Sequence, residues 1–266
     1  MTTWLNLTGK TVIVTGGCSG IGAAVVQEFL NQACNVVVSD LQEKQSDNDK
    51  LMYLACDVSK REDVEKMVTK TLEKFGSVDI LVNNAGINIP TLLVDSKKSY
   101  SKYELNDAVY DKVMDINVKG VYLVAQTVGR IFVEKGSGVI INMSSECGLE
   151  GSEGQSIYAA SKNAVNSFTR SWAKELGKYG VRVVGVAPGI LEATGLRTLA
   201  YEQALAYTRG VTVEKIREGY TSSKTTPLAR DGKLSEVADL VAYLASERAS
   251  YVHGVTYNVA GGKTRG

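Results

Sequence analysis

The stretch Thr11-Val-Ile-Val-Thr-Gly-Gly-Cys-Ser-Gly-Ile-Gly22 joins a short β-branched run to a glycine-rich turn. Its first five residues have the composition of a strand buried on both faces of a parallel sheet. The apolar residues that follow, Ala23, Val26, Phe29 and Leu30, have helical spacing. Strand, glycine turn and helix in this order are typical of the first unit of a doubly wound α/β fold.

The glycines of this turn, Gly16, Gly20 and Gly22, have the spacing G-x-x-x-G-x-G rather than the common G-x-G-x-x-G. Glycines allow phosphates to approach the backbone, and free N–H groups at a helix start bind anions. We therefore expect the turn to hold the pyrophosphate of a dinucleotide. The alternative is a plain glycine-rich turn.

The second apolar run, residues 35–40, ends in Asp40, 18 positions after Gly22. An acid near this position binds the adenosine ribose in dinucleotide sites. Its negative charge would repel the additional phosphate of NADP, and no Lys or Arg occurs at positions 17–19 or 41 to offset it. We expect NAD rather than NADP, the alternative being that Asp40 only caps the following turn.

The remaining chain continues the alternation of strand and helix patterns. It predicts one domain over residues 1–266, a Rossmann-type, doubly wound parallel sheet of about seven strands with helices on both faces. Irregular insertions, rich in Lys, Arg and Tyr, interrupt the pattern near 88–105 and 195–230, and the second is expected to contain two short helices. Strands are expected at 11–15, 35–40, 51–56, 78–82, 139–143, 181–187 and 255–259, and helices at 62–75, 106–115, 121–135, up to 179 after the fifth strand, and 234–246.

Composition excludes several classes of function. The 266 residues include 30 Lys+Arg and 29 Asp+Glu, a net charge of +1, which is no footprint for nucleic acid or an anionic membrane. No apolar run approaches the roughly 20 residues that span a bilayer, and the N-terminus lacks a signal-peptide pattern. The four cysteines lack metal-ligand spacing, so we expect reduced thiols in a cytoplasmic protein without a metal.

Two single residues could carry chemistry of their own. The only histidine, His253, lies far from any nucleophile-like motif, so we interpret it as a turn or packing residue. Cys147 lies two positions after Ser145, and a structural thiol is favoured over a reactive one.

Tyr158 and Lys162 are four positions apart in a segment with helical character, so they share one helix face. A neighbouring ammonium favours the phenolate and would lower the pKa of the phenol from its usual value near 10. Such a tyrosine can exchange a proton with an alcohol. Ser145 follows the apolar run 139–143, which places its hydroxyl at the carboxyl edge of the sheet, where ligands bind. Alone, a Tyr-x-x-x-Lys pair is more simply an exposed helix pair.

Six motifs in order make the chain resemble the short-chain dehydrogenase/reductase family over almost its whole length. They are Thr15-Gly16-x-x-x-Gly20-x-Gly22, Asn83-Asn84-Ala85-Gly86, Asn117, Ser145, Tyr158-x-x-x-Lys162 and Pro188-Gly189. The resemblance implies that Tyr158 is the catalytic acid/base, with Lys162 lowering its pKa and binding the nicotinamide ribose. It also implies that Ser145 polarises the substrate oxygen, and that Asn117 holds a water of the proton relay.

The resemblance also implies a cofactor site for NAD. Its residues would be Gly16, Ser19, Ile21 and Gly22 at the pyrophosphate and adjoining ribose, Asp40 at the adenosine ribose, and Asp57 and Val58 at the adenine. Asn84, Ala85 and Gly86 would line the path to the nicotinamide, which Pro188, Gly189 and Ile190 would flank. Thr194 lies one position farther from Pro188-Gly189 than the family's usual threonine, which leaves its role open.

A closer resemblance, carried by residues 144–155, 186–192, 195–197 and 260–266, is to family members of Gram-positive bacteria that interconvert sorbitol 6-phosphate and fructose 6-phosphate. It implies a sugar phosphate substrate, and the family implies a homotetramer built on residues 121–135 and 158–179. The alternatives are another polyol or sugar phosphate, or a catalytically silent NAD(H)-sensing protein. Candidate phosphate ligands are Lys97, Lys98, Lys102, Arg197, Arg209 and Lys224, with Lys263 and Arg265 reaching a neighbouring subunit.

Overall fold

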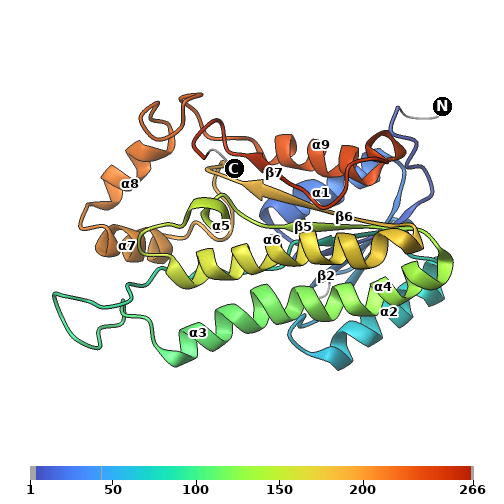
Figure 1. Ribbon diagram of the computed structural model, residues 1–266, viewed down its shortest axis with the longest axis horizontal. Helices are drawn as coiled ribbons and strands as arrows, with labels where there is room; N and C mark the ends of the chain where they lie inside the picture. Colours follow the sequence, from blue (N-terminus) through green and yellow to red (C-terminus); the bar gives the residue numbers. More distant parts are fainter. Residues whose placement is uncertain (1–3, 43, 265–266) are drawn as a thin grey trace.

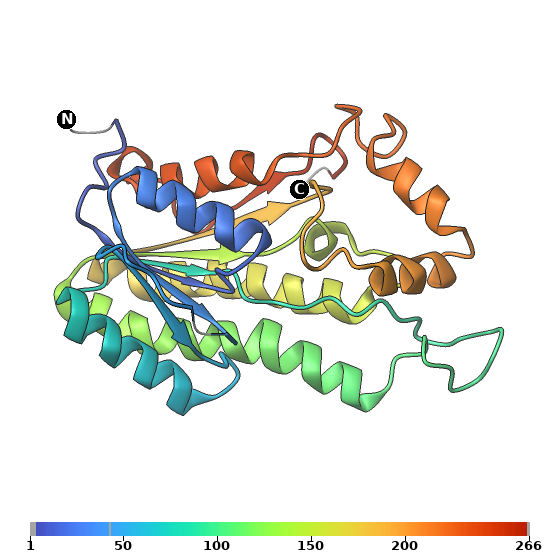
Figure 2. The same ribbon diagram turned by 180° about the vertical axis from the view of Figure 1, so that it is seen from behind.

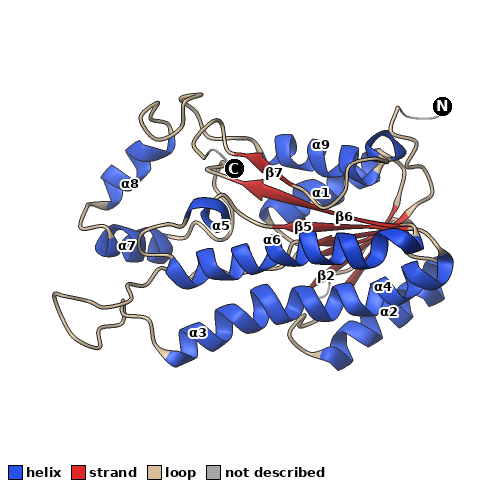
Figure 3. Ribbon diagram, viewed as in Figure 1, coloured by secondary structure: helices blue, strands red, loops and turns tan. Residues whose placement is uncertain are grey.

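The computed structural model describes residues 4–42 and 44–264 of the chain. Seven parallel strands form one sheet in the order β3-β2-β1-β4-β5-β6-β7, with helices on both faces (Figures 1 and 3). The predicted Rossmann-type fold class is therefore confirmed. The strands are β1 (Thr11–Thr15), β2 (Asn35–Asp40), β3 (Leu51–Ala55), β4 (Ile80–Asn83), β5 (Gly138–Met143), β6 (Val181–Pro188) and β7 (Thr256–Val259).

The strand order reverses at β1, which pairs in parallel with β2 on one side and β4 on the other. The connections that leave β1 and β4 therefore run to opposite faces, and a crevice opens at the carboxyl ends of the two strands. Thr15, the last residue of β1, closes the base of this crevice: its Oγ1 accepts the N–H groups of Asn84 and Ala85, both at 3.0 Å. The sheet topology thus places the glycine turn beside the end of β4.

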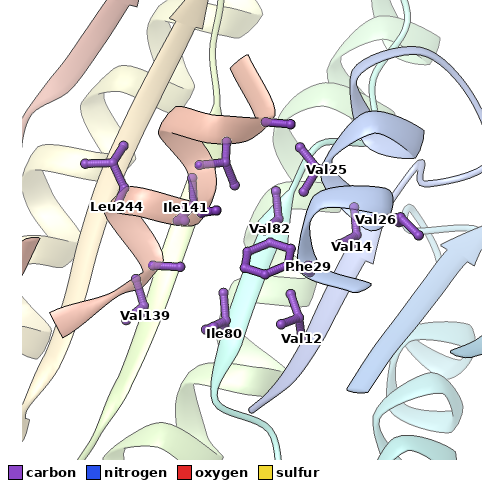
Figure 4. Packing of buried hydrophobic residues seen from close by; sticks show 14 of the residues in the cluster. Val12, Val14, Val25, Val26, Phe29, Ile80, Val82, Val139, Ile141 and Leu244 are labelled. Atoms are coloured by element: carbon purple, nitrogen blue, oxygen red, sulfur yellow. The ribbon is translucent and has the colours of Figure 1, made fainter. Parts of the chain in front are cut away.

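One face of the sheet is covered by α1 (Gly20–Asn31) and α9 (Leu234–Ala245), which pack against each other. Phe29 of α1 is fully buried over Val12 and Ile80, and Leu244 of α9 joins the same core (Figure 4). Truncating a buried phenylalanine to alanine costs about 3–5 kcal/mol. This packing fixes the start of α1, and with it the glycine turn, against the sheet.

The opposite face is covered by α2 (Arg61–Phe75), α4 (Val121–Lys135) and α6 (Ser156–Leu176) (Figure 2). Phe132, Met67 and Leu81 are at most 1% exposed in the core beneath these helices. Because α6 lies against β5 and β6, the residues in its first two turns reach the carboxyl edge of the sheet.

The helical patterns at 106–115 and 121–135 belong to one continuous rod. α3 (Asp107–Met114) passes through a π-helical turn, η1 (Asp115–Gly120), directly into α4. A π-turn inserts an extra residue into the helix and often occurs at functional sites. Here it turns Asn117, which is fully buried, toward the end of β4.

The two insertions lie next to each other beyond the carboxyl end of the sheet (Figures 1 and 2). The first, 88–105, has only isolated bridges, and the second contains the two predicted helices, α7 (Leu199–Thr208) and α8 (Val213–Tyr220). The described chain has no helix with the length and apolar character needed to cross a membrane. The short remaining elements are α5 (Cys147–Glu150), η2 (Gly177–Tyr179) and η3 (Glu247–Ala249).

Candidate active site

The glycine turn can carry side chains at neither of its two crowded positions. Gly16 has φ +64°, and a Cβ there would lie 2.9 Å from the Cα of Ala85. A Cβ on Gly22 would lie 2.1 Å from the carbonyl oxygen of Gly16. The Asn84 amide donates to the carbonyls of Thr15 and Gly16, both at 3.0 Å, and so ties the turn to the end of β4. Gly22 and Asn84 thus shape the turn by packing and hydrogen bonding.

A cleft of about 340 Å³ opens at the crevice between β1 and β4. Twelve of the residues expected to bind the cofactor line it. Gly22 lies behind the turn, and Gly189 and Ile190 line the neighbouring cavity instead. The twelve are Gly16, Ser19, Ile21, Asp40, Asp57, Val58, Asn84, Ala85, Gly86, Tyr158, Lys162 and Pro188.

Backbone donors hold the Asp40 carboxylate at the end of β2 in this cleft. Its oxygens accept the N–H groups of Cys18 at 2.9 Å and Leu41 at 2.8 Å. Ser19, the N-cap residue of α1, uses its side chain for no capping hydrogen bond. Thr194, whose role the sequence left open, packs against the turn: a Cβ on Gly20 would meet its Cβ at 3.2 Å.

The structure brings Asn117, Tyr158 and Lys162 together at the end of β4. A Cβ built on Gly86 would lie 3.2 Å from Asn117 Oδ1 and 3.3 Å from Lys162 Nζ. Lys162 Nζ lies 5.8 Å from the ring centroid of Tyr158. Ser145, which follows β5, lines a cavity together with Tyr158. All four predicted catalytic residues therefore converge on one region.

Burial dominates the ionisation of the tyrosine and lysine. The dense protein environment raises the pKa of the Tyr158 phenol above its usual value, and the adjacent Cys147 raises it further, while a hydrogen bond with Ser145 lowers it. Burial lowers the pKa of Lys162 to about 8. Lys162 is only 4% exposed and donates to the carbonyl of Met143 at 2.9 Å. The net shift of the phenol pKa is therefore upward in the protein alone, and the expected lowering by Lys162 stays a prediction.

Hydrogen bonds use every donor and an acceptor of the Asn117 side chain. Its amide nitrogen donates to the Ile87 carbonyl at 2.9 Å and to Ser161 Oγ at 3.0 Å. Its oxygen accepts the Ile87 N–H at 2.8 Å. Ser161 in turn donates to the Tyr158 carbonyl at 2.7 Å. This chain of contacts couples the π-turn, the end of β4 and the helix turn that carries the tyrosine.

A second cavity, of about 540 Å³, adjoins the first and shares Tyr158, Pro188 and Thr194 with it. Its walls come from Ser145 and Gln155 and from α7 and α8, which contribute Tyr201 and Tyr220. The sequence did not single out Gln155, whose side chain amide donates to Tyr201 at 2.8 Å. It also missed Asn88, whose Oδ1 is buried in this wall without a partner among the described residues. No local pattern marks either residue.

The basic residues of the first insertion do not line this cavity. Lys97 lies over the ring of Tyr207 at 4.7 Å, and Lys102 over that of Tyr103 at 4.9 Å. Lys98 of the same insertion and Lys224 of the second insertion do not line the cavity either. None of these four lysines is therefore placed to bind a phosphate in it.

The two candidates at the end of the chain have different outcomes. Lys263 lines the cavity of its own chain, 2.6 Å from Glu146. Within the chain it pairs with Glu146 and, at 3.5 Å, with Glu150, and its contact with a neighbouring subunit stays a prediction. Arg265 lies outside the described residues.

The contacts of His253 and Cys147 indicate structural rather than catalytic roles. His253 accepts the Val183 N–H on Nδ1 at 3.0 Å, and its Nε2 lies 2.7 Å from the Ala173 carbonyl, so it joins β6 to α6. Cys147 borders the second cavity, but burial and the nearby Glu146 raise the pKa of its thiol. A raised pKa disfavours the reactive thiolate, which fits the structural interpretation.

The parallel sheet, the glycine turn and the Tyr158–Lys162 pair agree with the comparison to known protein families. The family model of the short-chain dehydrogenases matches residues 10–205. The chain belongs to the short-chain dehydrogenase/reductase family and is an oxidoreductase of that class.

Individual relatives match the chain from end to end. It is 56% identical to a sorbitol-6-phosphate 2-dehydrogenase of Klebsiella pneumoniae, with 100% of both chains covered. That relative comes from a Gram-negative bacterium, unlike the Gram-positive members that the sequence resembled. A 3-oxoacyl-[acyl-carrier-protein] reductase of Thermotoga maritima is 35% identical, covering 97% of this chain and 99% of the relative.

Solved structures agree with the fold. A 3-ketoacyl-(acyl-carrier-protein) reductase from Brucella melitensis, complexed with NADH, matches with a TM-score of 0.80 and 30% identity, covering 97% of this chain and 99% of that one. A ligand-free aldohexose dehydrogenase of Thermoplasma acidophilum matches with a TM-score of 0.83 and 26% identity, covering 98% and 96%.

Proposed function

We propose that the protein interconverts sorbitol 6-phosphate and fructose 6-phosphate with NAD as cofactor. The observation that carries this proposal is the 56% identity, over the whole of both chains, to a sorbitol-6-phosphate 2-dehydrogenase. The convergence of Asn117, Tyr158 and Lys162 beside a cavity lined by Ser145 supports it, because a proton-transfer set is of use only to an enzyme.

The residues of the first cleft fit a dinucleotide. The turn around Gly16 leaves no room for side chains, and Gly16, Ser19, Gly20 and Ile21 at the start of α1 line the cleft, where a helix N-terminus suits a pyrophosphate. The fixed carboxylate of Asp40 suits ribose hydroxyls and repels a 2′-phosphate, which favours NAD over NADP. Asp57 and Val58 line the same cleft and would contact the adenine, and Pro188 lines both this cleft and the substrate cavity.

When bound, the nicotinamide supplies the hydride chemistry. The protein's own residues position the substrate and move the proton. In the proposed mechanism the Tyr158 oxygen takes the proton of the substrate hydroxyl during oxidation and returns it to the carbonyl oxygen during reduction. Ser145 Oγ donates a hydrogen bond to the same substrate oxygen. The Lys162 ammonium, 5.8 Å from the phenol ring, stabilises the phenolate that forms during proton transfer, and Asn117 fixes this helix turn.

The proposal is tested by following NADH absorbance with the purified protein. Sorbitol 6-phosphate, free sorbitol and other hexitol phosphates are compared in oxidation, and a panel of ketose phosphates in reduction. We expect the highest kcat/KM with sorbitol 6-phosphate. A preference for free sorbitol or for another polyol phosphate would replace the substrate, and no turnover with any of them would favour an NAD(H)-sensing protein.

We also propose a homotetramer built on α4 and α6, as in related family members. Trp172 and Phe168 stack at 4.6 Å on α6 and are only partly buried, so a partner helix could cover them. Light scattering of the protein as it elutes from a size-exclusion column measures its molar mass and so tests the tetramer.

The protein is also proposed to be cytoplasmic, because its four free thiols suit a reducing compartment.

A further inference from the structure

We propose that Arg197 and Arg209 bind the phosphate of the substrate at the end of the second cavity. This inference rests on the proposed function and names the residues behind its preference for a phosphorylated sugar. Both arginines line the cavity that Ser145 and Tyr158 also line. They come from the second insertion, which lies beyond the carboxyl ends of β5 and β6 (Figure 1).

The charges of the other cations in the cavity wall are already matched. Four cationic side chains line the cavity: Arg197, Arg209, Lys215 and Lys263. Lys263 lies 2.6 Å from the buried Glu146, and Lys215 lies 3.0 Å from Glu218. Neither arginine has a carboxylate within 4.0 Å in the described part of the chain. Glu153 and Glu192 also line the wall, so the two arginines are the lining cations that have no carboxylate within 4.0 Å among the described residues.

Neutral contacts hold both guanidinium groups in place. Arg197 donates to the Leu191 carbonyl and stacks on the ring of Tyr220 at 3.9 Å. Arg209 donates to Ser152 Oγ at 3.1 Å and to the Glu153 carbonyl at 3.4 Å. Each guanidinium has five N–H donors, so several remain free in both residues. Such preorganised forks match the oxygens of a phosphate.

Two phenols add donors at the same end. Tyr201 accepts the Gln155 amide at 2.8 Å, which leaves its own O–H proton free to donate. The Tyr220 hydroxyl is buried without a hydrogen-bond partner among the described residues. Burial raises the pKa of both phenols, and the positive charge of Arg209 acts in the opposite direction on each. Two free cations and two phenol donors favour an anion over a neutral hydroxyl group.

The test measures selectivity: the ratio of kcat/KM for sorbitol 6-phosphate to that for free sorbitol. Arg209→Gln and Arg197→Gln should each lower this ratio about 10- to 100-fold, as expected for the loss of charge-assisted hydrogen bonds. Arg209→Lys should restore part of it, because a point charge replaces only part of a planar fork. Lys215→Gln, in the same wall but paired with Glu218, is the matched control and should keep the ratio.

Inorganic phosphate supplies a second readout. It should compete with sorbitol 6-phosphate for the wild type, and more weakly for Arg209→Gln. An unchanged ratio in both glutamine variants, or a loss as large in Lys215→Gln, would overturn the assignment while the wild type still prefers the phosphorylated substrate. A wild type that prefers free sorbitol would instead overturn the proposed substrate, and this inference with it.

Discussion

The hydroxyl of Tyr207 donates a 2.7 Å hydrogen bond to the carboxylate of Asp95, which lies 112 positions earlier in the chain. Asp95 is 2% exposed in the first insertion and also accepts Ser101 Oγ at 2.6 Å. Tyr207 belongs to α7, and the ring of Tyr103 stacks on it at 4.1 Å. The first insertion is thus fastened to the helix that carries Tyr201 and ends beside Arg209.

Removing this hydrogen bond should loosen α7 over the substrate cavity. For Tyr207→Phe we expect KM for sorbitol 6-phosphate to rise several-fold with little change in kcat. Stability should also fall, because a hydrogen bond to a charged group is lost. Tyr100→Phe, in the same insertion but 94% exposed, is the control. Equal KM values in both variants would show that the contact does not position α7.

The hydrogen bonds to Asp95 also have a consequence for pH. They hold the pKa of its carboxyl well below the usual value, at about 2. The contact with Tyr207 should therefore persist down to strongly acidic conditions. The KM of the wild type for the substrate should therefore not change near pH 4. A change near pH 4 that is absent in Asp95→Asn would contradict the low pKa of Asp95.

Replacing Tyr158 with Phe removes the hydroxyl that exchanges the proton and keeps the ring. We expect kcat to fall about 10²- to 10⁴-fold, the usual contribution of general acid–base catalysis. The Kd for NADH, measured by fluorescence titration, should stay within about twofold, since the ring still fills the wall of the cleft. Tyr179→Phe, a 44% exposed tyrosine, is the control. A Tyr158→Phe enzyme that keeps more than about a tenth of native activity would refute the catalytic role.

The buried ammonium of Lys162 should couple stability to pH. Its pKa falls from 10.5 to about 8 on folding because burial penalises the charge. Folding therefore carries the full penalty below pH 8, and loses it as pH rises from about 8 to 10.5. The stability of the wild type relative to Lys162→Met should rise across that range, by an amount on the order of 3 kcal/mol.

Denaturant melts of both proteins at closely spaced pH values measure this difference. Subtracting the variant removes the effect of other groups, such as Cys34, whose pKa burial raises to about 12. A flat difference would mean that Lys162 has the same pKa in the folded and unfolded states, as a solvated lysine does.

Asp40 should set the choice between cofactors. The wild type should use NAD with a higher kcat/KM than NADP. Asp40→Asn removes the negative charge but keeps a similar shape, so the NADP-to-NAD ratio should rise on the order of tenfold, about 1.4 kcal/mol. Asp49→Asn, exposed in the loop after β2, controls for net charge. Equal turnover with both cofactors in the wild type would remove this role from Asp40.

The sequence by itself determined the sheet. Each strand is a short β-branched run that must be buried, and each helix has an apolar stripe, so burial periodicity encodes them locally. The seven expected strands agree with the structure within two residues at each end. The glycine turn was predictable from its glycine spacing between a strand pattern and a helix pattern.

Only the tertiary structure decided how the candidate residues are used. Charges along the chain do not reveal their partners, so Lys263 was as good a phosphate candidate as Arg197 and Arg209 until the fold showed Glu146 beside it. The direction of the Tyr158 pKa shift likewise depends on how many atoms surround the phenol. The Asp95–Tyr207 hydrogen bond joins a loop to a helix 112 positions away. Such a contact depends on the packing of the whole fold, and no local sequence pattern reveals it.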